Sequence, residues 1–270
     1  MSNPFHVDEF KKNSLTTWLG REFIYLEEIE STNTYLKRVP SGHLIHGTVL
    51  LADHQVSGRG QYEKKWISDP FKNLTFTIAL KPKVNLSLTL LTLGCAAALS
   101  EALQKFTSQF IQIKWPNDLM VNGEKLGGIL TESVFIGSNV ERVIIGVGIN
   151  INQTQISDPD SYNSCSLMNL TNRKFTREEV LNQCLFEIET MYDHWIHSNP
   201  VMIRSIHSRL IGYGEWVKLQ VYDELLPDLY KCIGINEKGE LLMLNEQLDV
   251  DKFSYEQVRI FPVKPAVQEA

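Results

Sequence analysis

The chain has 270 residues, enough for one large domain and a small one, with 43% hydrophobic and 21% charged residues as in an ordinary globular protein. Its formal net charge of −6 argues against a dedicated nucleic-acid-binding protein, because such proteins normally have a basic face. The four cysteines form no CxxC pair and no apolar signal core opens the chain, so we expect reduced thiols in a cytoplasmic protein.

The first half of the chain alternates short apolar runs with turn residues. Residues 30–34 carry hydroxyl and amide side chains suited to a helix N-cap and predict a strand-to-helix junction. Apolar runs at residues 48–52 and 74–80 predict two strands, the first leading directly into a glycine loop at residues 57–60. Residues 88–107 are rich in Leu and Ala and predict a long buried helix, whose polar interruptions argue against a membrane span.

A strand and a hairpin are predicted in the middle of the chain. Residues 111–115 alternate as a strand that stops at Pro116, which has no N–H for a central ladder. Asn122-Gly123 is a strong two-residue turn signal and predicts a hairpin whose second strand begins at residues 124–130. Residues 143–149 predict a further buried strand.

The last third of the chain changes from helix to short strands. Thr176-x-x-Glu179 has the pattern of a capping box and predicts the start of a second long helix. The buried face of that helix is predicted from apolar residues at helical spacing: Val180, Leu181, Cys184, Leu185, Ile188, Tyr192 and Trp195. After about residue 212, short strands at residues 216–221, 230–235 and 241–244 are typical of a small barrel. We therefore predict a larger domain over residues 1–211 and a small β-barrel over residues 212–270.

The order of these elements predicts an α+β fold with a mixed β-sheet. Strands at both ends of the larger domain, with helices between them, favour a mixed sheet over a parallel Rossmann sheet. Gly146-x-Gly148 lacks the third glycine of the dinucleotide-binding fingerprint, and no GxxxxGK[ST] sequence occurs. A nucleotide would therefore be bound by another design.

Gly58-Arg59-Gly60 directly follows a predicted strand and has the residue types that bind an anion. The two glycines let backbone N–H groups approach an anion closely. Arg59 offers a planar fork of donors that matches a carboxylate or phosphate. Taken alone, the motif is explained more simply as a surface turn, because short glycine motifs are common.

A second polar cluster lies where the strand at residues 111–115 ends. It contains Lys114, Asn117 and Asp118, and Lys125 follows in the predicted hairpin; each of these residues alone is well explained by a turn or a solvated surface. Two unit charges about 4 Å apart repel by roughly 4 kcal/mol near a protein surface, so joining a carboxylate to a phosphate requires fixed cations. Together with Arg59, this cluster supplies the cations and the carboxylate that such a reaction needs.

In their order along the chain, these motifs resemble those of biotin protein ligases. The matching positions are Ser31-Thr32-Asn33, Gln55, Gly58-Arg59-Gly60, Trp66, Lys114 through Asp118, Lys125 through Leu130, and Gly146-x-Gly148-x-Asn150. Any one motif is weak evidence, but six in order with matching gaps between about residues 27 and 152 are specific. The resemblance implies a mixed β-sheet catalytic domain of the biotin/lipoate ligase type, followed by a small C-terminal SH3-like β-barrel.

The resemblance also implies a two-step reaction that uses biotin, ATP and Mg²⁺. Biotin and ATP form biotinyl-5′-AMP, and biotin then passes to a lysine on the biotin carboxyl carrier domain of a carboxylase. The implied catalytic residues are Lys125, Arg59 and Asp118, with Asp118 binding Mg²⁺ or positioning the acceptor lysine. The implied biotin-binding residues are Ser31, Thr32, Asn33, Gln55, Gly58, Arg59, Gly60 and Lys125. The implied nucleotide-binding residues are Gly60, Gln61, Trp66, Lys114, Asn117 and Asn150.

The glycine loop departs from the family pattern. Most relatives continue it as GRGRxG, whereas this chain has Gln61 in place of the second arginine and Glu63 in place of the third glycine. One interpretation is a tolerated variant in which Gln61 hydrogen-bonds instead, and the other is a looser loop that releases the adenylate early. We favour the first, because Lys64 and Lys65 follow directly and restore positive charge.

Two other functions compete with this interpretation. A lipoate ligase shares the fold and the adenylation chemistry, but its usual arginine-plus-triple-glycine loop is absent from this sequence. A non-catalytic biotin-binding module is the second alternative, and the presence of Lys125 and Asp118 argues against it. Only about 26 residues precede the Ser31 region, too few for a helix-turn-helix domain, so we expect no DNA partner. The sequence leaves the oligomeric state open, including a homodimer.

Overall fold

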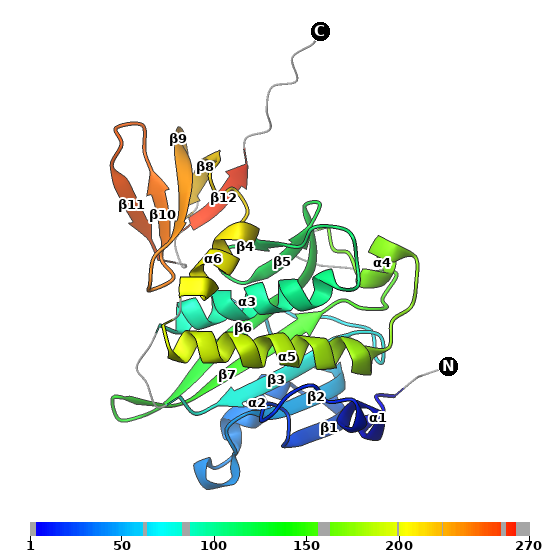
Figure 1. Cartoon of the computed structure of the whole chain (residues 1–270). Coiled ribbons are helices and arrows are strands. Elements are labelled where there is room, and N and C mark those ends of the chain that lie inside the picture. Colours follow the sequence, from blue (N-terminus) through cyan, green and yellow to red (C-terminus); the bar gives the residue numbers. More distant parts are fainter. Residues whose placement is uncertain are drawn as a thin grey trace.

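The computed structural model describes residues 4–61, 64–82, 87–155, 163–198, 200–222, 224–254 and 258–262. Its main feature is a seven-stranded sheet in the order β1-β2-β3-β7-β6-β5-β4 (Figure 1). The strands are β1 Phe23–Ile29, β2 Thr48–Gln55, β3 Leu74–Leu80, β4 Gln112–Lys114, β5 Asp118–Val121, β6 Glu124–Ile136 and β7 Asn139–Ile149. β1 pairs in parallel with β2, and the other neighbours pair antiparallel. The predicted mixed sheet is therefore confirmed.

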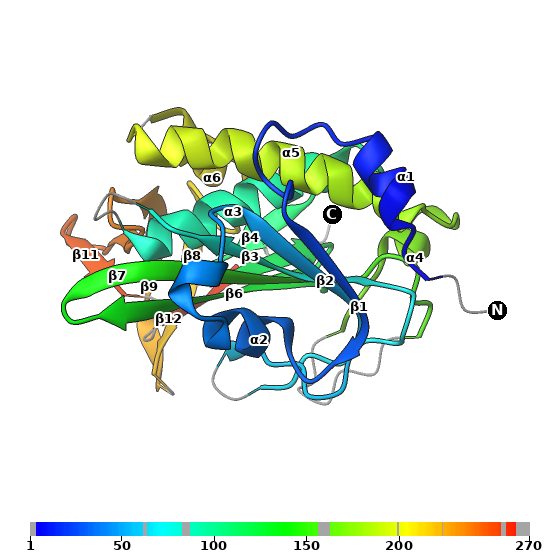
Figure 2. The ribbon, with the colours of Figure 1, turned by 90° about the horizontal axis from the view of Figure 1, so that it is seen from below.

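Helices cover the two faces of this sheet unequally (Figure 2). One face carries the two long helices, α3 Leu88–Gln104 and α5 Arg177–Ile196, together with α1 Val7–Lys12 and α6 Pro200–Arg209. The opposite face carries the short helix α2 Thr32–Arg38. Two further short elements are η1 Ser41–His43 and α4 Leu167–Thr171. No helix among the described residues is long and apolar enough to cross a membrane.

The register of the central strands explains this division of the faces. Thr131 of β6 pairs with Ile145 of β7, and its hydroxyl lies 2.8 Å from that of Thr92 in α3. Side chains in a strand alternate between faces, so the residue after Ile145 faces the other way. That residue is Gly146, which lies against Asn33 of α2. On the α2 face, small residues gather in one part of the sheet: Thr75, Thr77, Gly128, Gly146 and Gly148. Elsewhere on this face, Leu50, Ala79 and Ile144 pack with Leu36 of α2.

The predicted hairpin and the predicted long helices are present. Asn122 and Gly123 both have positive φ, 51° and 83°, as the tight turn between β5 and β6 requires. The predicted apolar face of α5 is buried, including Trp195 at 1% exposure. The predicted capping box at Thr176 is wrong, since its side chain makes no capping hydrogen bond. The reciprocal capping pair is instead at Ser166 and Asn169 in α4, because an asparagine at the third helical position makes the same return bond.

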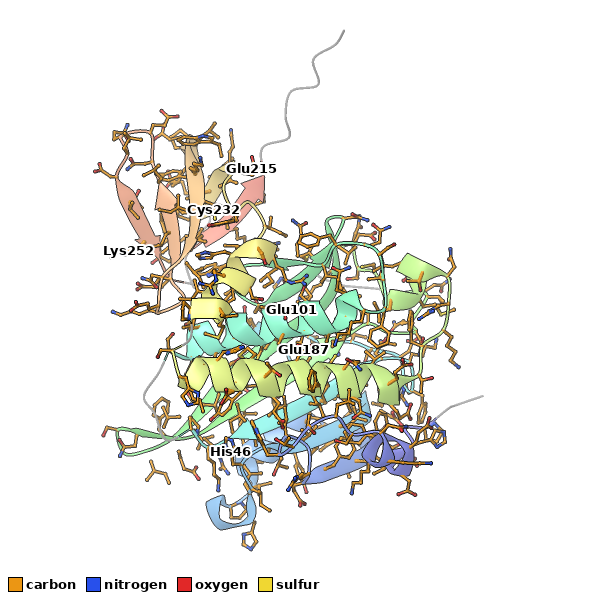
Figure 3. All side chains as sticks on the ribbon, in the orientation of Figure 1. His46, Glu101, Glu187, Glu215, Cys232 and Lys252 are labelled. Atoms are coloured by element: carbon orange, nitrogen blue, oxygen red, sulfur yellow. The ribbon has the colours of Figure 1, made fainter. Side chains whose placement is uncertain are left out.

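The C-terminal module is a second, five-stranded antiparallel sheet in the order β11-β10-β9-β8-β12. Its strands are β8 Trp216–Val221, β9 Glu224–Ile235, β10 Leu241–Leu244, β11 Val250–Phe253 and β12 Val258–Pro262. Figure 3 shows Cys232 inside this module, where its side chain is fully buried. The predicted small β module is confirmed, and the strand predicted at residues 230–235 is the second half of the longer β9.

The module is joined to the rest of the chain by packing and by hydrogen bonds. Buried side chains of the module, such as Leu219, belong to the same apolar cluster as the core beneath the main sheet. His207 of α6 accepts a hydrogen bond at its Nε2 from the Ile235 amide, at 2.9 Å. The domain boundary at residues 211 and 212 stays a prediction, close to the start of β8 at Trp216.

Candidate active site

The start of α2 places three predicted site residues on the small-residue face of the sheet. Ser31 is the N-cap of this helix, and its hydroxyl accepts a hydrogen bond from the Thr34 amide at 3.4 Å. Thr32 and Asn33 follow in the first turn, and all three site residues are buried. The predicted strand-to-helix junction is confirmed.

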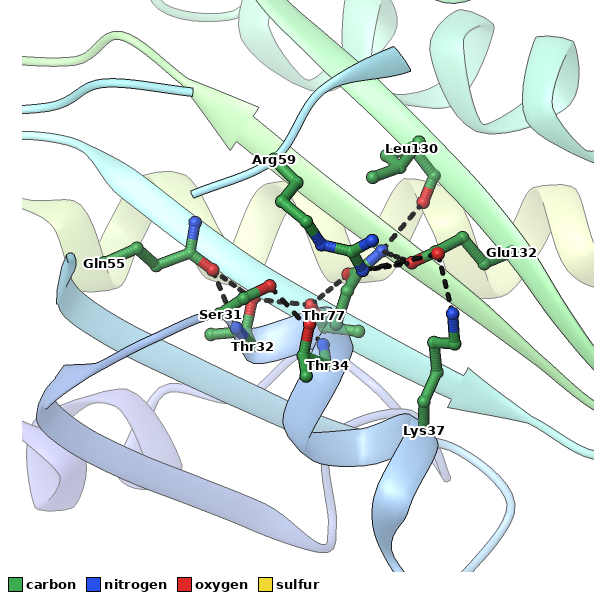
Figure 4. A network of polar contacts seen from close by, with 10 residues as sticks. Ser31, Thr32, Thr34, Lys37, Gln55, Arg59, Thr77, Leu130 and Glu132 are labelled. Atoms are coloured by element: carbon green, nitrogen blue, oxygen red, sulfur yellow. Dashed lines mark hydrogen bonds and ion pairs between the residues drawn. The ribbon is translucent and has the colours of Figure 1, made fainter. Parts of the chain in front are cut away.

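Thr32 bonds directly to Gln55, and Thr77, a residue that sequence reasoning missed, joins Thr32 to Asn33 (Figure 4). Gln55 Oε1 accepts hydrogen bonds from the amide of Thr32, at 2.7 Å, and from its hydroxyl, at 2.9 Å. The Thr77 hydroxyl of β3 lies 2.7 Å from Thr32 Oγ1 and 2.6 Å from Asn33 Oδ1. We call Ser31, Thr32, Asn33, Gln55 and Thr77 the polar wall. Thr77 carries no sequence signal beyond a polar residue in an apolar strand.

Glu132 of β6 is the second residue that was missed, and it binds three other side chains (Figure 4). Its Oε2 accepts from Asn33 Nδ2 at 2.9 Å and from the guanidinium of Arg59 at 3.0 Å. Its Oε1 accepts from Lys37 Nζ at 2.8 Å. Burial raises the pKa of Glu132, but hydrogen bonds from Lys37 and Asn33 and the charge of Arg59 bring it below the ordinary value. A half-buried carboxylate with a Lys and an Arg partner stays ionised. Because Glu132 binds both Arg59 and Asn33, it ties the glycine loop to the polar wall.

The glycine loop is closed by its own backbone. Gly60 N donates to Lys64 O at 2.7 Å, and Trp66 N donates to Gly58 O at 3.0 Å. A Cβ at Gly58 would overlap the Trp66 carbonyl oxygen, so this position requires glycine. Gln61 lies at the tip, where its carbonyl accepts from the Lys64 amide at 3.1 Å. Glu63 lies outside the described residues.

Trp66 covers part of the small-residue face of the sheet, which we call the floor of the site. A Cβ at Gly148 would lie 2.5 Å from the indole ring of Trp66, so the ring packs directly on this glycine. The indole Nε1 donates to Thr75 Oγ1 at 3.3 Å. Thr75 and Gly148 are register partners on the α2 face of the sheet. The resemblance implies that Trp66 shapes the nucleotide end, and in the structure its ring lies over Gly148 among the small residues of the α2 face.

Asp118 and Lys125 form the other end of the site. Asp118 Oδ1 lies 2.7 Å from Lys125 Nζ, and both side chains are partly exposed. Gly128 lies beneath the pair, since a Cβ there would be 3.1 Å from Asp118 Oδ1 and 3.4 Å from Lys125 Nζ. The backbone of Lys125 is held on both sides, because its N–H donates to Asn163 O and its carbonyl accepts from Cys165 N. The structure thus brings these two predicted catalytic residues together, whereas Arg59 pairs with Glu132.

Three other predicted nucleotide-binding residues shape the strands around this lysine end. Asn117 Nδ2 donates to Ile129 O at 2.9 Å, and Asn150 Nδ2 donates to Cys165 O at 3.1 Å. The side-chain amides of Asn117 and Asn150 therefore hold the backbone beside Lys125. Lys114 is half-buried in β4 and is the register partner of Asp118.

The arrangement has the uncharged polar wall at one end, backed by Glu132 and its partners Lys37 and Arg59, and the ion pair of Lys125 and Asp118 at the other. Residues that pair across neighbouring strands form rows on this face of the sheet. The first row contains Asp118, Gly128, Gly148 and Thr75, and the second contains Gly146 and Thr77. The polar wall stands over the second row, and the Asp118–Lys125 pair stands over the first. A ligand with a neutral polar ring and an anionic group fits this order. Among the described residues, no group of three or more His, Cys, Asp or Glu side chains is arranged to hold a metal ion.

Known proteins are similar to this chain in both sequence and fold. The model of the biotin/lipoate A/B protein ligase family matches residues 25–150. The bifunctional ligase/repressor BirA of Bacillus spizizenii is 30% identical over 236 residues, which cover 86% of this chain and 72% of BirA. The biotin–[acetyl-CoA-carboxylase] ligase of Mycobacterium tuberculosis is 28% identical, with 83% of each chain covered. The biotin protein ligase from Aquifex aeolicus, solved in complex with biotin and ATP, superimposes with a TM-score of 0.76 at 32% identity, covering 89% of this chain and 99% of that one. The chain therefore belongs to the biotin/lipoate A/B protein ligase family and is a ligase enzyme.

Proposed function

We propose that this enzyme joins biotin to ATP to form biotinyl-5′-AMP and then transfers biotin to a lysine of a biotin carboxyl carrier domain. The observation that carries the proposal is the order of groups along the floor, with the polar wall at one end and the Asp118–Lys125 pair at the other. The names of the relatives, biotin protein ligases among them, support biotin over lipoate as the acid.

The polar wall fits the ureido ring of biotin. A cyclic urea has one carbonyl acceptor and two N–H donors and no charge, so it is recognised by neutral donors and acceptors. Ser31, Thr32, Asn33 and Gln55 are neutral, and the bonds among Thr32, Asn33, Thr77 and Gln55 fix their directions. A wall that is already ordered loses little side-chain entropy when the ligand binds.

The lysine end fits the carboxylate of biotin and the α-phosphate of ATP. Lys125 places a positive charge where two anions must meet, and its charge stabilises the transition state as pyrophosphate leaves. Asp118 holds the ammonium group of Lys125 in place, a role that we prefer to direct binding of the acceptor lysine. Arg59 of the glycine loop supplies a second cation, which Glu132 holds, whereas the Gly60 N–H is already bonded to the Lys64 carbonyl and helps to keep the loop closed.

Mg²⁺ enters this proposal with the nucleotide. In many ATP-using sites it is held by one or two carboxylates together with the substrate phosphates, and it needs no complete protein cage. Asp118 fits that limited role, because the lysine end has a carboxylate but no cluster of ligands among the described residues. When bound, the ion neutralises negative charge on the phosphates. The nucleotide itself would lie near Gly60, Gln61, Trp66 and Lys114, with Asn117 and Asn150 holding the backbone around it.

The second step needs an acceptor amine. The unprotonated Nζ of a carrier lysine attacks the carbonyl carbon of the mixed anhydride, an amide bond forms, AMP leaves, and the amine loses a proton. The floor and the loop would keep water from the anhydride until the carrier arrives. The free, buried cysteines Cys95, Cys165, Cys184 and Cys232 fit a cytoplasmic setting for this reaction.

Incubation with ATP, Mg²⁺ and labelled biotin, with and without a biotin carboxyl carrier domain, tests the proposal. We expect biotin-dependent exchange of pyrophosphate into ATP without the carrier, and stable label on the carrier when it is present. Exchange that depends on lipoate and not on biotin would favour the lipoate ligase alternative. Tight biotin binding without any exchange would identify a non-catalytic module.

A further inference from the structure

The turn between β9 and β10 of the C-terminal module reaches into the catalytic part of the chain. The carbonyl of Gly239 accepts a hydrogen bond from the indole Nε1 of Trp115 at 3.2 Å. The carbonyl of Lys238 accepts from the hydroxyl of Ser87, the N-cap of α3, at 2.6 Å. A Cβ at Gly239 would lie 2.9 Å from the amide nitrogen of Leu90, so the turn packs against the backbone of α3.

This turn has a fixed shape of its own. The side-chain oxygen of Asn236 accepts from the amides of Lys238, at 2.9 Å, and Glu240, at 3.1 Å. Its Nδ2 donates to Glu240 Oε2 at 2.6 Å, and the amide of Gly239 donates to the carbonyl of Asn236. An asparagine that bonds to the backbone two residues on preorganises a turn. The carbonyls of Lys238 and Gly239 are therefore aimed before they meet their partners.

Trp115 connects this turn to the lysine end of the site. Its side chain is 5% exposed, so the indole has little room to move. It lies in the tight turn between β4 and β5, where the amide of Asn117 donates to the carbonyl of Lys114. That turn leads directly into Asp118, which holds Lys125 Nζ at 2.7 Å. A displacement of the indole would therefore move the segment that carries Asp118.

We propose that the β9–β10 turn is a positioning element for the Asp118–Lys125 pair, acting through the hydrogen bond from Trp115 to the Gly239 carbonyl. The catalytic importance of the pair rests on the proposed function. The link from the turn through Trp115 to Asp118 rests on the observed contacts alone. Among the described residues, the hydrogen bonds of this turn go to Ser87, to Trp115 and within the turn itself, and none goes to the polar wall. The turn therefore acts on the rate of adenylate formation and leaves recognition of the biotin ring unchanged.

Two glycines of the module provide a matched pair of variants. Gly239 and Gly214 have nearly the same positive φ, 78° and 80°, so an alanine at either position has the same backbone strain. A Cβ at Gly214 meets nothing within 4 Å, whereas a Cβ at Gly239 meets the α3 backbone. Gly239→Ala therefore displaces the turn, and Gly214→Ala reports the strain alone. Trp115→Phe is the gentler variant, because it deletes the indole N–H and keeps an aromatic ring.

Hydrogen exchange followed by mass spectrometry tests the link without reference to activity. We expect the peptide covering residues 112–121 to exchange about tenfold faster in Gly239→Ala and in Trp115→Phe than in Gly214→Ala, because its anchor is lost. The peptide covering α2 should exchange equally in all of them. Equal exchange of residues 112–121 in all variants overturns the proposal, whether or not the wild-type protein proves to be a biotin ligase.

Pyrophosphate exchange then tests the consequence for catalysis. We expect kcat to fall by about tenfold in Gly239→Ala and less in Trp115→Phe, with the KM for biotin unchanged. The double variant should be no slower than Gly239→Ala, since both changes break one contact. A rise in the KM for biotin with unchanged kcat, or additive losses in the double variant, would overturn the positioning role. If the wild-type protein shows no biotin-dependent pyrophosphate exchange, the proposed function is contradicted. The hydrogen-exchange result, and the link that it tests, would still stand.

Discussion

The two ends of the site are held in place by different kinds of contact. At the polar wall, Thr32, Asn33, Gln55 and Thr77 are joined side chain to side chain, and Glu132 extends the network to the loop. At the other end, the Asp118–Lys125 pair is one contact between two side chains, on strands fixed by their backbone bonds. A change in the wall should therefore spread to its neighbours, whereas a change in the lysine pair should remove one chemical group and leave the frame intact.

Lys125→Ala is expected to have the largest effect on activity. The variant removes the cation at the point where the two anions meet, and losses on the order of 100-fold or more are usual for such groups. Because the backbone bonds to Asn163 and Cys165 do not involve the side chain, the fold should be retained. Biotin-dependent pyrophosphate exchange measures the loss. Lys105→Ala is the control, since Lys105 forms an ion pair with Glu187 away from the site; a wild-type exchange rate in Lys125→Ala would contradict the assignment.

Gly146→Ala should damage the polar wall as a unit. A Cβ at this position would overlap the side-chain amide of Asn33, which has to move away from Thr77 and Glu132. We expect the KM for biotin to rise more than about tenfold and the free energy of unfolding to fall by about 1–3 kcal/mol. Kinetics and thermal unfolding measure the two effects. Gly42→Ala is the control, because a Cβ there meets nothing within 4 Å, and an unchanged KM in Gly146→Ala would show that Asn33 does not contact biotin.

The variants Glu132→Gln and Glu189→Gln compare a carboxylate that supports the polar wall with a carboxylate elsewhere in the fold. Glu189 of α5 also has a lowered pKa: burial raises it, but hydrogen bonds from Leu19, Thr17 and Trp18 outweigh this effect. Each Glu→Gln change removes charge-assisted bonds and should cost roughly 1 kcal/mol of stability, allowing for partial exposure. Of the two variants, Glu132→Gln alone should raise the KM for biotin, by about fivefold, because Glu132 binds Asn33 and Glu189 does not. Equal KM values in the two variants would contradict this distinction.

The pKa of Glu132 also gives the direction of a pH effect. Because its pKa in the folded protein lies below the ordinary 4.5, its stabilising contribution is complete above pH 4.5 and is lost as the pH falls through the folded value. The stability difference between the wild-type protein and Glu132→Gln should therefore shrink on acidification below about pH 4.5. Denaturant unfolding of both proteins from pH 6 to pH 3 measures this difference, and a difference that grows toward low pH would contradict it.

The two ends of the site also differ in how far the sequence could predict them. The lysine end is built around a turn signal, Asn122-Gly123, and from residues close in sequence. Local pattern placed Lys125 in a hairpin strand and Asp118 in the polar segment just before that hairpin, and the structure begins β5 at Asp118 and pairs it with β6. The wall joins α2, β2 and β3, and Glu132 links it to β6; these elements are far apart in sequence and meet only in the folded protein. Thr77 and Glu132 were missed because a polar residue within a strand has no local pattern that marks its partners.

The same limit applies to the contact between the two parts of the chain. Strands at residues 216–221 and 241–244 were predicted at their observed bounds, because alternation and turn residues are local signals. The bond between Trp115 and Gly239 links residues 124 positions apart. Its partners are an aromatic residue and a turn glycine, which are each well explained without the other.

Gln61→Arg should have the smallest effect, and it addresses the loop between the two ends. The loop is closed by backbone bonds at Gly58, Gly60 and Gln61, which do not depend on the side chain at the tip. We therefore expect the wild-type enzyme to retain biotinyl-5′-AMP, and the added arginine to change its release by less than about twofold, the effect of a single exposed charge.

Chromatography of the medium after incubation with biotin and ATP, without a carrier, measures the free adenylate. Gly58→Ala is the matched comparison, since its Cβ would overlap the Trp66 carbonyl oxygen and force the loop open. High release from Gly58→Ala together with low release from both the wild-type enzyme and Gln61→Arg would show that backbone closure retains the intermediate. Rapid release from the wild-type enzyme that Gln61→Arg suppresses would show that the second cation is needed, and that the loop of this chain is the looser of the two alternatives.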